Sequence, residues 1–231
     1  MKSTFFSVFL LAATMLGADA ESKIWIIKAD GLGEAVTIQA GIDTATPGDT
    51  LLVSQGTYTG TGNRGISTAG KPLLIIAEWR YNPLITAPST IDLQGEYLGF
   101  IINSSEDSTT ILDGLSITWA YREGINCSNA SPRIRYCAIT SCNPCIRLSH
   151  ANSIIEHSLL SSTPSIVGVA INCEYSSPNI QFNEIHGNGE ENATAIACTY
   201  CTSMNIIGNT ITAPGGETGV GIYLELTGRH S

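Results

Sequence analysis

The chain has little charge and few basic residues. Only 13% of its 231 residues are charged, and 20 acidic residues outnumber 11 basic ones, which gives a formal net charge of −9. Nucleic acids and anionic lipid surfaces bind basic patches, so this composition argues against both as partners. It is equally unsuited to an acidic polysaccharide unless a metal ion bridges the two. The 23 glycines and the scarcity of charge are typical of solenoids, in which polar turns surround a dry apolar interior.

The sequence also lacks several catalytic motifs and long apolar runs. It contains no GxSxG, HExxH or P-loop pattern, and beyond its first 20 residues no stretch approaches transmembrane length. Residues 1–20 combine the positive charge of Lys2, an apolar core at 5–16 and a small-x-small site that ends at Ala20. This pattern predicts a signal peptide, so we expect a secreted protein, extracellular or at the cell surface, with no transmembrane segment.

What the sequence does contain is an internal repeat over residues 124–211. In one unit Ile125 is followed nine residues later by Ile134, and five residues after that by Ile139. Three more units follow the same pattern within one residue, and in the unit that starts at Ile146 we align Ile154 and Leu159. The isoleucines expected to point inward are Ile125, Ile134, Ile139, Ile171, Ile180, Ile185, Ile196, Ile206 and Ile211.

A repeat unit of 20–26 residues cannot bury its own apolar face, and must stack on copies of itself. Each unit contains three short apolar stretches, which predict three short strands per coil. The fold class that we predict is therefore all-β, a right-handed single-stranded parallel β-helix of about seven coils.

Both ends of the solenoid need a cover, because an open end exposes strand edges and apolar core. Residues 36–45 predict a short capping helix with Ile38 and Ile42 on one face. We divide the chain into a signal peptide (1–20), cap and first coil (21–60) and further coils (61–231). A new coil begins at Gly221 with no cap after it, which predicts a truncated chain or self-association through the uncapped C-terminal coil.

The seven cysteines of this chain first suggest disulfides, because exported proteins often contain them. However, Cys127, Cys173 and Cys198 each follow a leading isoleucine by two residues, so they face the same way as that isoleucine. We interpret them as an inward column of small apolar side chains, with Leu148 in the equivalent place of the intervening unit. The disulfide state stays open for Cys142, Cys145 and Cys201.

Three stretches resemble a known family. Residues 37–58 resemble the opening of secreted right-handed parallel β-helix repeat proteins, and residues 112–118 and 131–139 resemble their repeat units. The likeness covers residues 23–226 and implies the pectin-lyase-like superfold. Enzymes of this superfold use carboxylates, alone or through Ca²⁺, and arginine on outward columns of neighbouring coils. The resemblance therefore implies a polysaccharide lyase or glycoside hydrolase as one possibility, with Ca²⁺ as the cofactor of a lyase. The residues themselves indicate no cofactor or metal site.

The outward columns contain few residues of this kind. The outward column directly after the leading isoleucines consists of Asn126, Arg147, Asn172 and Ala197. The column two residues later consists of Ser128, Ser149, Glu174 and Thr199. Only Glu174 is acidic, with Arg147 one coil away, whereas sugar hydrolysis needs two carboxyl groups roughly 5–9.5 Å apart. We read Glu106 as part of a solvated loop. The expected turn column consists of Cys137, His157, Asn183 and Asn209.

A further column is more suggestive. His150, Tyr175 and Tyr200 lie four residues after the leading isoleucine of consecutive units, so we predict a stacked aromatic ladder. Beside Arg147 and Glu174, such a strip would suit sugar rings, although stacked rings can also simply stabilise a solenoid face. We therefore favour a module that binds carbohydrate, with a polysaccharide or cell-surface partner. The alternatives are the enzyme and a structural spacer or adhesin segment.

Overall fold

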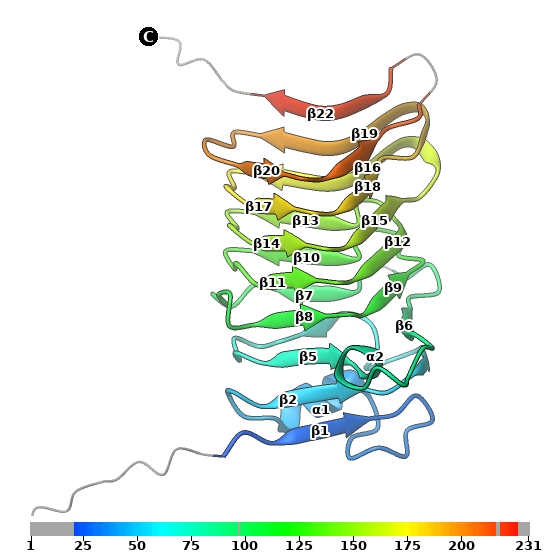
Figure 1. Ribbon diagram of the computed structural model, residues 1–231, viewed down its shortest axis with the longest axis vertical. Coiled ribbons are helices and arrows are strands. Elements are labelled where there is room, and N and C mark those ends of the chain that lie inside the picture. The colour runs from blue at the N-terminus through cyan, green and yellow to red at the C-terminus, as the bar shows by residue number, and fades with distance from the viewer. Residues whose placement is uncertain (1–20, 97, 216–217, 226–231) are drawn as a thin grey trace, which may run out of the picture.

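The computed structural model describes residues 21–96, 98–215 and 218–225. The predicted signal peptide lies outside this range. The described chain is a right-handed parallel β-helix of about eight coils, one more than expected. Figure 1 shows the strands stacked along the long axis, from β1 at one end to β22 at the other. No helix among the described residues is long and apolar enough to cross a membrane.

The first coil contributes β1 alone, and each later coil contributes one strand to each of three parallel sheets. Sheet A contains, in spatial order, β1 (Ile24–Ile27), β2 (Thr50–Val53), β5 (Leu74–Ala77), β8 (Ile111–Asp113), β11 (Arg133–Arg135), β14 (Ile154–Glu156), β17 (Asn179–Gln181) and β20 (Asn205–Ile207). Sheet B contains β3 (Gly56–Tyr58), β6 (Ser89–Asp92), β9 (Ser116–Thr118), β12 (Ala138–Cys142), β15 (Leu159–Ser162), β18 (Glu184–His186) and β21 (Thr210–Thr212). Sheet C contains β4 (Ile66–Ser67), β7 (Phe100–Ile102), β10 (Ile125–Ser128), β13 (Ile146–Ser149), β16 (Ser165–Glu174), β19 (Gly189–Thr199) and β22 (Val220–Glu225).

The core follows the predicted periodicity, because alternate side chains of a strand point to opposite faces and the coils stack in register. Seven of the nine isoleucines expected inside are fully buried, and Ile206 and Ile211 in the last coils are partly buried against the core. One unit was aligned wrongly. Its buried residues are Ile155 and Leu160, so the offsets there are again nine and five. Each of these residues follows an adjacent apolar residue, which made the register ambiguous in the sequence.

The predicted cysteine column is confirmed. Cys127, Leu148, Cys173 and Cys198 are in register on neighbouring strands of sheet C, and all four side chains are buried. All seven cysteines are free thiols, which settles the state that the sequence left open for Cys142, Cys145 and Cys201.

The predicted capping helix is also confirmed, as α1 (Ile38–Thr44). Its N-cap is Thr37, whose hydroxyl accepts a hydrogen bond from the Ala40 amide at 3.2 Å. Ile38 and Ile42 are buried, as predicted. A Cβ at Gly41 would lie 2.7 Å from Cδ1 of Ile27, so a glycine there lets the helix pack directly on the first coil.

A second helix, α2 (Glu78–Tyr81), forms a single turn between β5 and β6 and was not predicted. It lies outside the stacked sheets, beside the first coils (Figure 1). The sequence did not reveal it because four residues are too few to establish a helical period.

The predicted turn column is in fact two adjacent columns. The outer one contains Tyr136, His157, Phe182 and Gly208, all with positive φ. The inner one contains Cys137, Ser158, Asn183 and Asn209. In the inner column the amide of Ser158 donates to Oδ1 of Asn183 at 2.9 Å, and the amide of Asn183 donates to Oδ1 of Asn209 at 2.8 Å. His157 was therefore placed one column too far inward. The cause is the same one-residue error in register, because three residues after Ile155 comes Ser158, whereas His157 was counted from Ile154.

Candidate functional site

The aromatic ladder predicted on sheet C is present. The rings of His150 and Tyr175 are stacked with centroids 5.0 Å apart, and those of Tyr175 and Tyr200 with centroids 4.6 Å apart. Each of the three residues directly follows a strand of sheet C and has a φ between +48° and +58°, so the same turn places one ring above the next. Because the ring faces cover one another, the ladder presents mainly ring edges to solvent, and Tyr175 is 49% exposed.

The predicted neighbours of the ladder also come together. Arg147 on β13 and Glu174 on β16 form an ion pair, with 3.5 Å between Nη2 and Oε2. Both side chains are more than one-third exposed. Such a surface ion pair stabilises the fold by only about 0–1 kcal/mol.

A polar groove of about 420 Å³ lies over the outer face of sheet C, across β7, β10 and β13. It is lined by Ile101, Asn103, Arg122, Glu123, Asn126, Ser128, Arg147 and Ser149. Arg147 therefore belongs both to this groove and to the pair with Glu174. Among the predicted site residues, Arg147 lines the groove, whereas His150, Tyr175 and Tyr200 form the adjacent ladder.

Glu123 is the most unusual residue of the groove. Its side chain is only 3% exposed, and its Oε2 accepts no hydrogen bond from any residue that the structure describes. Two arginines approach it at longer distances, Nε of Arg122 at 3.5 Å from Oε2 and Nη1 of Arg147 at 3.8 Å from Oε1. A buried carboxylate oxygen that accepts no hydrogen bond costs free energy.

The backbone around Glu123 is pressed closely onto the coil before it. A Cβ at Gly99 would lie 2.2 Å from the carbonyl oxygen of Gly124, so this approach requires glycine at position 99. The amide of Gly99 donates to the carbonyl of Glu123 at 3.1 Å. Sequence reasoning missed Glu123 because it belongs to the connection before β10 and not to an outward strand column. The one available signal was its place directly before a leading Gly-Ile pair.

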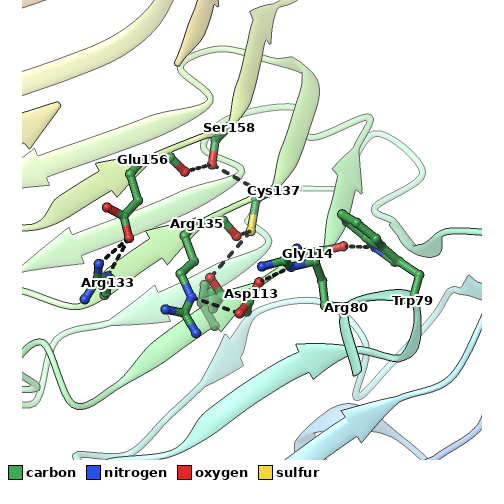
Figure 2. Close-up of polar contacts among 10 residues, drawn as sticks. Trp79, Arg80, Asp113, Gly114, Arg133, Arg135, Cys137, Glu156 and Ser158 are labelled. Carbon is green, nitrogen blue, oxygen red and sulfur yellow. Dashed lines mark hydrogen bonds and ion pairs between the residues drawn. The ribbon is translucent and has the colours of Figure 1, made fainter. Parts of the chain in front are cut away.

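A second cluster of charges lies on the outer face of sheet A (Figure 2). Asp113 at the end of β8 is 2% exposed and accepts hydrogen bonds from Nε of Arg80 at 2.9 Å and Nε of Arg135 at 2.8 Å. Figure 2 shows the two arginines reaching this carboxylate from α2 and from β11. Both oxygens of Asp113 thus accept a hydrogen bond, whereas Oε2 of Glu123 has only the longer ion pair with Arg122.

The other carboxylate of this cluster, Glu156, is paired as well. It accepts hydrogen bonds from Nε of Arg133 at 2.6 Å and from the side-chain Nε2 of Gln181 at 2.9 Å. Burial raises the pKa of Glu156, but the hydrogen bonds from Gln181 and Arg133 outweigh it and hold the pKa below its ordinary value. The carboxylates of sheet A therefore have the contacts of structural ion pairs.

The interpretation of Glu106 as a solvated loop residue is wrong. Glu106 is 5% exposed and accepts hydrogen bonds from the Thr68 hydroxyl at 2.6 Å, the Gly70 amide at 2.9 Å and the Ser104 amide at 2.7 Å. These bonds tie one coil to the next, so its role is structural. In the part of the chain that the structure describes, no three His, Cys, Asp or Glu side chains are placed to hold a metal ion.

Comparison with known proteins shows the fold. No family model and no curated protein sequence matches the chain. The crystal structure of pectate lyase Pel9A matches with a TM-score of 0.55 over 77% of this chain, at 12% sequence identity. The fold is the pectin-lyase-like β-helix. The chain covers 52% of the length of that lyase, and at this identity the match bears on the fold and not on the reaction.

Proposed function

We propose that the outer face of sheet C binds a polysaccharide chain, with the groove around Glu123 as its centre. The observation that carries this proposal is the carboxylate of Glu123, a residue that lines the groove. Its buried Oε2 has no hydrogen-bond donor among the described residues, and the nearest cation is Nε of Arg122 at 3.5 Å. Since Oε2 is buried, a sugar hydroxyl in the groove would donate to this oxygen after the Glu123 side chain turns toward the groove.

The rest of the groove has the chemistry that sugar recognition requires. Asn126 and Ser149 can donate to and accept from hydroxyl groups, and the guanidinium groups of Arg122 and Arg147 offer further donors. Ile101 provides an apolar surface for the carbon face of a sugar ring. The groove is polar without being strongly charged, because its two arginines face Glu123 and the nearby Glu174.

A second candidate function is polysaccharide cleavage at the same place. Arg147 lies between two carboxylates, 3.8 Å from Glu123 in the groove and 3.5 Å from Glu174 beside it. This combination can transfer protons and stabilise developing charge. The likeness to a pectate lyase adds only the fold to this argument.

The test is a screen of the purified protein against acidic and neutral polysaccharides, with and without Ca²⁺. Binding is measured by calorimetry, and products are analysed for new double bonds and new reducing ends. We expect binding without turnover. Ca²⁺-dependent double bonds would instead indicate a lyase, and reducing ends alone a hydrolase. No binding to any polysaccharide would leave a spacer or adhesin segment as the explanation.

Two variants locate the site once a binding polysaccharide is known. Glu123→Gln removes the charge of the buried acceptor and Asn126→Ala removes a polar contact, and each should weaken binding about tenfold or less. The matched control is Glu190→Gln, which removes an exposed carboxylate away from the groove. Unchanged affinity in both groove variants would rule out this groove as the binding site.

A further inference from the structure

The buried carboxylate of Asp113 orients two arginine side chains in an unusual way. Arg80 and Arg135 both contact it through Nε, at 2.9 and 2.8 Å. Neither arginine uses its terminal nitrogens for a hydrogen bond with the residues that the structure describes. Their side chains are 28% and 29% exposed, so two guanidinium forks are held in place and remain partly open to solvent.

The local charge favours an anion at this place. Three guanidinium groups, those of Arg80, Arg133 and Arg135, face the two carboxylates Asp113 and Glu156 (Figure 2). The excess of one positive charge contrasts with the net charge of −9 for the chain. An arginine fork binds a carboxylate through two parallel hydrogen bonds, which is the strongest pairing that arginine makes with an organic anion.

An aromatic groove of about 420 Å³ adjoins the arginines. Its lining includes Trp79, Pro88, Tyr136 and Ala138. The indole of Trp79 donates to the carbonyl of Gly114 at 2.7 Å, which holds the ring in place. Cζ of Arg80 lies 3.7 Å from the centroid of the Tyr136 ring, so the charged and aromatic parts of the site are in direct contact.

Gly114 makes this arrangement possible. It has a φ of +75°, and a Cβ there would lie 2.2 Å from Cγ of Arg80. Gly114 occupies, one coil earlier, the position that Tyr136 has in the outer turn column. It has no ring to stack on Tyr136, and the side chain of Arg80 lies over that ring instead. The site therefore depends on the insertion of α2 into the otherwise regular stack.

We propose that this site binds a segment of a partner protein in which an acidic side chain lies next to an aromatic or large apolar one. The acidic group would pair with Arg80 and Arg135, and the apolar group would enter the groove between Trp79 and Tyr136. Protein interfaces are enriched in Trp, Tyr and Arg, the residue types that meet here.

Two further observations favour a protein segment over a sugar. The groove is walled mainly by carbon, unlike the polar groove of sheet C. The segment that forms one wall also carries Tyr81 and Leu84, which are 57% and 86% exposed. Large apolar side chains this exposed beside an apolar groove indicate a surface that a protein partner covers. The site belongs to sheets A and B and to α2, so it does not depend on the function proposed for sheet C.

The test uses nuclear magnetic resonance on the full chain, observing the Nε–H signals of Arg80 and Arg135 and the indole signal of Trp79. The probe is a capped peptide of sequence Asp-Phe-Asp, and its neutral control is Asn-Phe-Asn. We expect the acidic peptide to shift all three signals and the neutral one to bind at least about tenfold more weakly. A glucuronate oligosaccharide tests the alternative class of ligand.

Arg135→Lys keeps the charge but removes the fork, and should weaken binding of the acidic peptide about tenfold. The matched control is Arg64→Lys, which alters a surface ion pair with Glu96. Because Arg135→Lys disturbs a buried carboxylate, a second variant, Thr86→Glu, places a negative charge at the exposed rim of the groove and should weaken the same peptide. The proposal is overturned if the acidic peptide shifts none of the three signals, if both peptides bind equally, if the Arg135→Lys and Thr86→Glu chains bind like the unmodified one, or if only the oligosaccharide binds.

Discussion

The rings of Tyr175 and Tyr200 lie face to face, with centroids 4.6 Å apart and planes inclined by 18°. Each residue belongs to a different coil, so the contact ties β16 and β19 together at the end of sheet C. Because stacking covers the ring faces, the ladder should contribute more to stability than to sugar binding.

The double variant Tyr175→Ala/Tyr200→Ala tests this balance. It removes the stacking between His150 and Tyr175 as well as that between the two tyrosines, so we expect unfolding free energy to fall by about 1–3 kcal/mol. Affinity for a bound polysaccharide should change by less than about threefold, well under the effect of Glu123→Gln. Urea unfolding and calorimetry on the same samples give both values. Loss of binding with unchanged stability would show that the tyrosines are a sugar platform after all.

Gly208 closes the outer turn column, and its substitution should be costly. It has a φ of +64°, and a Cβ there would lie 2.7 Å from the ring of Phe182. Gly95 also has a positive φ, +77°, but a Cβ there would meet open space. Gly208→Ala should therefore destabilise the fold by about 1–2 kcal/mol more than Gly95→Ala does. Thermal unfolding of both variants measures the difference. The additional change Phe182→Ala should remove most of it, and failure to do so would contradict the proposed clash.

Asp49 should make the N-terminal coils sensitive to acid. Burial raises its pKa, but hydrogen bonds from the Trp25 indole, the Lys23 amide and Thr46 lower it from 3.8 to about 2. The folded state thus holds the ionised form more tightly than the unfolded state does. Its contribution, on the order of 2 kcal/mol, is present above pH 3.8 and is lost as the pH falls through about 2.

The variant Asp49→Asn should accordingly be less stable than the unmodified chain at pH 7 by about 2 kcal/mol, and the difference should shrink between pH 4 and pH 2. Urea unfolding at a series of pH values measures this. Asp43→Asn is the control, since Asp43 lies on the exposed side of α1 and contacts Gln39. A stability difference for Asp49→Asn that does not vary with pH would show that the carboxylate charge is not involved.

The buried thiols should resist modification in the native protein. Cys127 is fully buried, and burial raises its pKa to about 12, so almost no thiolate forms at pH 8. Cys201 is 6% exposed and should react first with a maleimide, whereas Cys127 should react only on unfolding. Mass spectrometry of time points identifies the labelled residue. Cys127→Ala should cost about 1 kcal/mol as a small core truncation. Rapid native labelling of Cys127 would contradict the inward column.

The repeat in the sequence was sufficient to predict the sheets and their outward columns. Asn126, Arg147 and Asn172 are in register on sheet C, as the offsets from the leading isoleucines implied. The same counting placed Tyr175 on the ring of His150. This works because successive side chains of a strand point to opposite faces and because the strands of neighbouring coils stack in register. The spacing of residues in the sequence therefore decides which of them share a column.

Only the tertiary structure decided what happens in the connections between strands. The burial of Glu123 and the place of Arg80 over Tyr136 depend on connections that vary in length from coil to coil. Such a connection has no repeating period, and its conformation is chosen by the coils packed on either side of it. The sequence therefore determined the scaffold of this protein, whereas the buried carboxylate of Glu123 and the pairing of Arg80 and Arg135 on Asp113 were decided by long-range packing.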